Sequence, residues 1–197
     1  MFRPLEAEER VAREAQALIR DHYARLGIWS LYEVCKHIAN PDDAQMVADQ
    51  LRRLKAPSPN MNKAGNLPPR YGGLYSGGEM VGLIKAGKYL SPKRALAGEL
   101  PYMNIHELVV ADRSIYTEAV AQSLAFGRSV LEVHQNEPAS VEVFALPEEL
   151  APYTATGFAI VQENSNSYDF DTTTSAPVHR LVRPNIRDGK LRVVKTT

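Results

Sequence analysis

The chain has 197 residues, and its 23 lysines and arginines balance its 23 aspartates and glutamates. A chain without net charge has no global positive field, which argues against binding to nucleic acid or anionic membranes by charge alone. Short apolar runs and a polar N-terminus predict no transmembrane span and no secretory signal. The single cysteine, Cys35, excludes an internal disulfide and favours a cytoplasmic location.

Three helices are predicted in residues 1–56, which we interpret as a helical N-terminal region. The first covers residues 4–26, because Pro4 suits a first turn, acidic residues follow it, and apolar residues recur at helical spacing up to Gly27. Ser30 and Glu33 form a capping box for a second helix over residues 30–40. Residues 41–55 form the third.

The third helix ends in Arg52, Arg53 and Lys55, and two interpretations are open. With the preceding helix it loosely matches a helix-turn-helix pair that presents basic side chains to DNA. Alternatively, the cations lie near a helix C-terminus, where the helix dipole favours them, in an ordinary packing unit. The balanced charge favours the second interpretation.

Residues 57–69 are rich in Pro, Asn and Ser and predict an exposed linker or loop. Residues 70–197 then predict an α+β domain with a mixed, mainly antiparallel sheet and short helices. The predicted strands cover residues 72–76, 88–91, 106–111, 129–135, 139–146, 157–163, 177–183 and 190–196, with a hairpin turn at 187–190. The predicted helices cover residues 78–87, 92–100 and 114–127, the last of them capped by Ser114 and ended by Gly127.

Six of the 12 glycines lie in residues 70–92. This stretch has neither the Gly-Lys-Ser/Thr of a phosphate-binding loop nor a Gly-x-Gly-x-x-Gly fingerprint. Its glycine pairs either form turns around a short strand or let a ligand approach the backbone. The five histidines are isolated, so no metal site is predicted, and no Gly-x-Ser-x-Gly elbow supplies a nucleophile.

The order of elements after Arg70 resembles the ADP-ribosyltransferase superfamily. The similarity lies in "GLYSGG", "EMVGLIKAG", "KYLSP" and "RSIYTEAVAQSLAFG" followed by "VLEV". In that superfamily a His or Arg stands on a first strand, an aromatic residue ahead of a helix stacks on nicotinamide, and a glutamate on a late strand orients the ribose. The resemblance therefore implies NAD as cofactor and transfer of ADP-ribose to a macromolecule, as in toxins and effectors.

The resemblance also implies a set of site residues. Tyr116 takes the place of the stacking aromatic residue, and Glu132, Glu142 and Glu163 are alternatives for the glutamate. Arg70 replaces the first-strand histidine, and NAD would lie over Arg70, Gly73, Tyr75, Ser76, Tyr89 and Ser91. The implied partners are a protein or nucleic-acid acceptor and a cognate inhibitor protein, with no membrane. The alternative interpretation is a noncatalytic binding or regulatory protein of a phage or mobile element.

Overall fold

The computed structural model describes residues 1–25, 40–55, 67–89, 96–98, 102–132, 140–165 and 178–184. The helices in these ranges are α1 (Glu9–Arg25), α3 (Ala44–Lys55), α5 (Tyr116–Glu132) and α6 (Leu150–Ala155), with short 3-10 turns η2 (Arg113–Ile115) and η3 (Pro147–Glu149). The strands are β1 (Arg3–Pro4), β2 (Leu67–Ser76), β3 (Glu79–Tyr89), β4 (Tyr102–Val110), β5 (Ser140–Ala145), β6 (Ala159–Ser165) and β7 (Val178–Pro184).

The strands form one sheet in the order β1-β2-β3-β4-β5-β7-β6. Every neighbouring pair is antiparallel except β4 and β5, which run parallel. Parallel neighbours need a crossover, and α5 supplies it between these two strands. The predicted α+β class with a mixed, mainly antiparallel sheet is confirmed.

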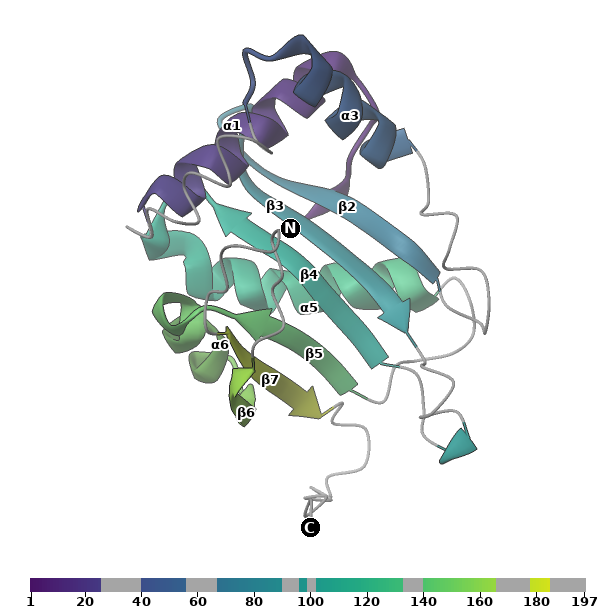
Figure 1. Ribbon diagram of the computed structural model, residues 1–197, viewed down its shortest axis with the longest axis vertical. Helices are drawn as coiled ribbons and strands as arrows, with labels where there is room; N and C mark the ends of the chain where they lie inside the picture. The colour runs from purple at the N-terminus through teal and green to yellow at the C-terminus, as the bar shows by residue number, and fades with distance from the viewer. Residues whose placement is uncertain are drawn as a thin grey trace.

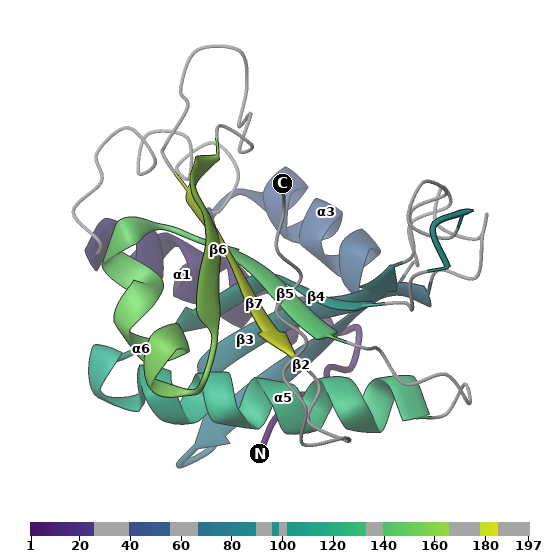
Figure 2. The same ribbon diagram turned by 90° about the horizontal axis from the view of Figure 1, so that it is seen from below.

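Helices cover both faces of the sheet (Figures 1 and 2). Helices α1 and α3 lie on one face, where Val11, Ala15 and Leu18 pack against Leu83 and Val109. Helix α5 lies on the other face, over a larger apolar cluster that includes side chains of β3, β4, β5 and β7. Each large apolar side chain buried in these layers contributes about 1.5–3 kcal/mol to folding.

The strands β2 and β3 of the glycine-rich stretch form a hairpin, so the helix predicted over residues 78–87 is wrong. Ser76 pairs with Glu79 across a two-residue turn formed by Gly77 and Gly78, whose φ angles are 59° and 91°. Two positive φ angles fit the turn that matches the twist of a hairpin. Residues 79–89 are apolar enough to be buried on both faces of a sheet, and such a run does not distinguish a strand from a buried helix.

Helix α5 was predicted with the wrong ends. Asp112, rather than Ser114, caps the helical segment, since its side chain accepts a hydrogen bond from Ser114 N at 2.7 Å. The helix continues through Gly127 to Glu132, so the strand predicted from residue 129 does not begin there. Gly127 serves packing instead: a Cβ there would lie 1.8 Å from Met103 Sδ on β4.

The N-terminal region also differs from its prediction at one end. The first helix begins at Glu9, and Arg3–Pro4 pair with Gly73 and Gly72 as strand β1. The third predicted helix is confirmed as α3. Residues 67–69, the end of the predicted linker, belong to β2.

Several predicted features lie outside the described residues. They are residues 57–66 of the linker, the second helix up to residue 39, residues 90–95, residues 133–135 of the strand predicted at 129–135, the turn at 187–190 and the last strand. The division into residues 1–56, 57–69 and 70–197 stays a prediction. Within the ranges that are described, no helix is both long and apolar enough to cross a membrane.

Candidate functional site

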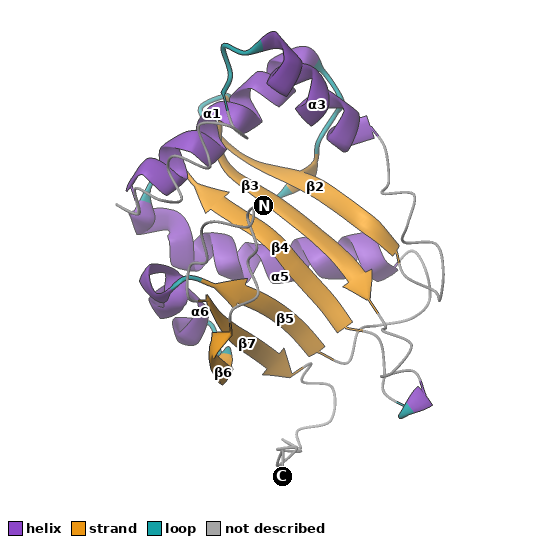
Figure 3. Ribbon diagram, in the orientation of Figure 1, coloured by secondary structure: helices purple, strands orange, loops and turns teal. Residues whose placement is uncertain are grey.

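Strands β4 and β5 pair over only part of their length. Their register runs from Tyr102↔Ser140 to Ile105↔Val143 and ends there, although β4 continues to Val110 and β5 to Ala145. The two strands lie side by side at one end and diverge toward their carboxyl ends (Figure 3). Among the described residues, one edge of β4 therefore has no strand partner over residues 106–110, which we call the divergent segment.

The divergent segment begins with a β-bulge. Ala86 pairs with Ile105 and Lys85 with Glu107, so His106 is the extra residue on β4. The bulge shifts the alternation of side chains by one residue, so residues 105 and 108 face the same side of the sheet. Ile105 and Leu108 lie in the cluster beneath α5, whereas Val109 packs with α1.

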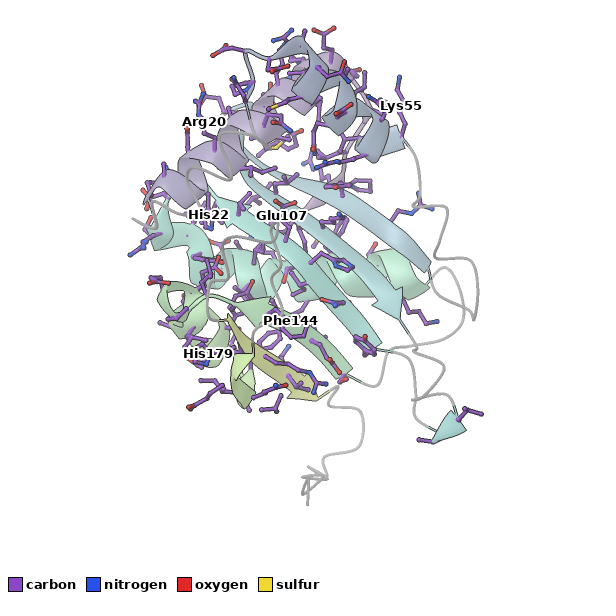
Figure 4. The ribbon with its side chains drawn as sticks, in the orientation of Figure 1. Arg20, His22, Lys55, Glu107, Phe144 and His179 are labelled. Atoms are coloured by element: carbon purple, nitrogen blue, oxygen red, sulfur yellow. The ribbon has the colours of Figure 1, made fainter. Side chains whose placement is uncertain are left out.

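Glu107 is a partly buried carboxylate next to this bulge, on the face covered by α1 and α3 (Figure 4). Burial raises its pKa, and the positive charges of Lys85 on β3 and Arg53 on α3, with His22 on α1, oppose that rise. Burial lowers the pKa of Lys85, whose ammonium lies 5.4 Å from the ring centre of Tyr71. A carboxylate with a raised pKa beside a strand edge is a candidate general base.

His106 next to it is held neutral. Burial and the charge of Lys85 lower the pKa of His106 to about 4. Because a neutral imidazole adds no charge, Lys85 remains the cation paired in register with Glu107. The largest opposing charges at Glu107 are thus those of Lys85 and Arg53.

A buried polar bridge crosses the carboxyl ends of β4 and β5. Tyr116, the first residue of α5, donates its hydroxyl to Glu149 Oε1 at 2.7 Å. His22 Nε2 on α1 lies 3.3 Å from the same oxygen. Each of these three residues is 8% exposed or less. We call Tyr116, Glu149 and His22 the polar bridge; it joins helices from both faces of the sheet.

The bridge satisfies backbone groups that the diverging strands leave without partners. The Tyr116 hydroxyl also lies 3.3 Å from the Leu108 carbonyl, and Leu146 N donates to Glu149 Oε2 at 3.0 Å. Val110 N lies 3.3 Å from His22 Nδ1, so the imidazole tautomer with its proton on Nε2 accepts from Val110 and donates to Glu149.

Two further contacts complete this end of the strands. Arg25 Nη2 donates to the Val110 carbonyl at 3.0 Å. The rings of Tyr116 and Tyr153 pack edge to face, with centroids 6.0 Å apart. Burial, followed by the neighbouring Tyr153 and Glu149, holds the pKa of Tyr116 well above its ordinary value. Tyr116 is therefore a protonated donor at neutral pH.

An ion pair between β5 and β7 lies close to the point where the pairing of β4 with β5 ends. Glu142 lies opposite Asn104 on β4 and accepts two hydrogen bonds from Arg180 on β7, at 2.8 and 3.1 Å. Asn104 Oδ1 is buried and has no hydrogen-bond partner among the described residues. A buried acceptor without a donor costs about 1–3 kcal/mol, which marks this oxygen as available to a donor from a ligand.

The structure separates the residues predicted as a site rather than gathering them. Strand β2 carries four of them, namely Arg70, Gly73, Tyr75 and Ser76, and two strands lie between β2 and β5, which carries Glu142. Glu163 is exposed on β6, at the far edge of the sheet. Glu132 and Tyr89 lie at the ends of α5 and β3, and Ser91 is outside the described residues.

Gly73, which was predicted to bind NAD, has a role in packing. A Cβ at Gly73 would lie 2.6 Å from Leu5 Cδ2, so this position is filled by the chain itself. Only Tyr116 of the predicted residues belongs to the polar bridge, in a different role from the predicted one. In the part of the chain that is described, no group of three or more His, Cys, Asp or Glu residues could hold a metal ion.

No protein-family model matches the sequence, and no curated protein matches it. Solved structures do match. The PaiA N-acetyltransferase of Thermoplasma acidophilum in complex with coenzyme A is 9% identical, with a TM-score of 0.59 over 94% of this chain and 98% of that one. A GNAT-family acetyltransferase from Streptococcus pneumoniae is 10% identical, with a TM-score of 0.55 over 94% of this chain and 99% of that one.

A third match is a phosphinothricin N-acetyltransferase, 11% identical, with a TM-score of 0.53 over 93% of this chain and 97% of that one. The chain has the fold of GNAT acetyltransferases. This finding overturns the resemblance to ADP-ribosyltransferases and, with it, the predicted transfer of ADP-ribose by a toxin or effector. The prediction of NAD as cofactor is likewise contradicted: the first of these neighbours is in complex with coenzyme A.

Sequence reasoning missed Glu107, Glu149 and His22. Glu107 did carry a signal, since it is a lone acid in the apolar strand "HELVV". The other two carried none: His22 and Glu149 are 127 residues apart and meet only in the fold.

Proposed function

We propose that this chain is an acyl-CoA-dependent N-acyltransferase, which moves an acyl group from a coenzyme A thioester to an amine. The observation that supports it is the divergence of β4 from β5 in a fold matched over 94% of the chain by N-acetyltransferases. At 9–11% identity, the likeness to those neighbours shows the fold alone. The proposed chemistry therefore rests on the residues of this chain.

The chemistry of the divergent segment suits coenzyme A. Its pantetheine arm contains two amides, and an extended amide chain pairs with a strand edge in the manner of an added strand. The edge of β4 over residues 106–110 provides such groups, in particular the Leu108 carbonyl and both polar groups of Val110. We therefore assign the pantetheine arm to the backbone of this segment.

Glu107 is the residue that we propose as the general base. An attacking amine has to lose a proton, and a carboxylate whose pKa is raised by burial accepts one more readily than an ordinary carboxylate. Asn104 Oδ1, a buried acceptor three residues earlier on the same strand, would accept a hydrogen bond from the amine and orient it. Coenzyme A, when bound, supplies the thioester and leaves as the thiol.

Lys85 and Arg53 keep the proposed base functional. Without nearby cations, burial would raise the pKa of Glu107 further and favour its protonated form, which cannot accept a proton. Their positive charges favour the carboxylate, and His106 stays neutral beside it. This arrangement leaves Glu107 with a pKa above its ordinary range and below what burial alone would produce.

A binding experiment tests the proposal first. Thermal melting with acetyl-CoA should show stabilisation, about 2.7 kcal/mol at 100 times the dissociation constant, whereas NAD should give none. Release of free thiol from acetyl-CoA in the presence of a panel of primary amines then tests the reaction. Absence of both stabilisation and thiol release at millimolar acetyl-CoA would refute the proposed function.

A further inference from the structure

We infer that the polar bridge is an autoinhibitory plug, which must open before the pantetheine arm can pair with β4. This inference rests on the proposed function. Tyr116 and His22 contact the Leu108 carbonyl and Val110 N, which the arm would use, and both residues are joined through Glu149. Binding of the donor and closure of the bridge are therefore mutually exclusive.

The competition is for particular atoms. The Leu108 carbonyl is within 3.3 Å of the Tyr116 hydroxyl, and Val110 N is within 3.3 Å of His22 Nδ1. A backbone N–H donates one hydrogen bond, so an amide of the arm and the imidazole cannot both be the partner of Val110 N. The Val110 carbonyl is in turn held by Arg25 at 3.0 Å.

The bridge is stable when closed because its polar atoms satisfy one another. Glu149 receives the Tyr116 hydroxyl and Leu146 N on its two oxygens, with His22 beside the first. Buried polar networks of this kind are well ordered only when every member is paired. Tyr116 is the first residue of α5 and Glu149 is the last residue of the short η3 turn, so both lie at the ends of their elements.

Closure lowers the apparent affinity for the donor. When only a fraction of molecules has the site open, the measured dissociation constant equals the intrinsic one divided by that fraction. Removing one bond of the bridge raises the open fraction. A hydrogen bond to a carboxylate such as Glu149 is charge-assisted, so its loss changes the equilibrium by about ten- to a hundredfold.

The test measures binding of coenzyme A by calorimetry to the wild type, Tyr116→Phe and Glu149→Gln. Tyr116→Phe deletes the hydroxyl and keeps the ring, and Glu149→Gln keeps an oxygen for Leu146 N while weakening the acceptor of Tyr116 and His22. Both should bind coenzyme A about ten- to a hundredfold more tightly than the wild type. Tyr75→Phe, which removes a hydroxyl on β2 outside the polar bridge, is the matched control and should bind like the wild type.

A second ligand tests whether the change in affinity arises from the pantetheine arm. Adenosine 3′,5′-bisphosphate lacks the pantetheine arm, so its affinity should be the same in all four proteins. Equal affinity of coenzyme A for Tyr116→Phe, Glu149→Gln and Tyr75→Phe would overturn the plug while leaving the proposed function intact. Failure of every protein to bind coenzyme A would instead refute the proposed function itself. Melting curves recorded for each variant show that the compared proteins are folded.

Discussion

Lys85 on β3 and Glu107 on β4 lie opposite each other in the register of the two strands. The pairing places an ammonium against a carboxylate in a partly buried setting, where the charge of Lys85 lowers the pKa of Glu107 and burial raises it. Three predictions follow from this pair and from His106 beside it, and a fourth concerns the packing of α5.

Glu107→Gln should abolish most of the amine-dependent release of thiol from acetyl-CoA. Loss of a general base costs about 10²–10⁴-fold in rate, and glutamine keeps the shape without accepting a proton. The wild-type rate should fall on the acid side with an apparent pKa above 4.5, because the pKa of Glu107 is raised. A Glu107→Gln variant that retains full activity would exclude Glu107 as the base.

Lys85→Met should move the acid side of the pH–rate profile to higher pH. Removing the ammonium takes away a charge that favours the carboxylate, so the pKa of Glu107 rises further. Arg53 and His22 remain and limit the shift. The measurement is the pH profile of kcat/KM, with Lys85→Arg as the charge-preserving control. A downward shift, or the same shift in both variants, would contradict this assignment.

His106 should make the fold less stable in mild acid. Its pKa of about 4 lies below the ordinary value of 6.5, so the unfolded chain binds more protons between these values. Stability from this group is complete above pH 6.5 and falls by about 3 kcal/mol as the pH drops to 4. Glu107, whose pKa is raised, contributes with the opposite sign.

The comparison of wild type with His106→Gln isolates that contribution. Denaturant unfolding at pH 7 and at pH 4.5 should show a smaller loss of stability in the variant, because glutamine does not titrate. Glu107 is present in both proteins, so its contribution cancels to first order. Equal losses in the two proteins would show that His106 has an ordinary pKa.

Gly127→Ala should destabilise the protein although alanine is the better helix former. The helix propensity gains about 1 kcal/mol, but the new Cβ would lie 1.8 Å from Met103 Sδ beneath α5. Overpacking of this kind costs about 1–3 kcal/mol. The double variant Gly127→Ala with Met103→Ala makes room for the methyl group and should show less than the sum of the two single losses. Strict additivity would place the cost elsewhere.

Local patterns in the sequence determined much of the secondary structure. Helices α1 and α3 and the strands β2, β4, β5, β6 and β7 were all found, with shifted ends, because apolar periodicity and turn residues are properties of short segments. The strand β3 was missed for the converse reason. Its apolar residues face both layers of the core, so it lacks the alternation that marks a strand with one wet face.

The candidate site, by contrast, was decided by the tertiary structure. Tripeptides that suggested an NAD site lie on strands separated by others in the sheet, since short motifs carry no information about strand order. The divergence of β4 from β5 depends on a register between strands more than thirty residues apart in the chain. His22, Glu149 and Tyr116 meet across that divergence because buried polar groups must find partners, and those partners are near only once the chain has folded.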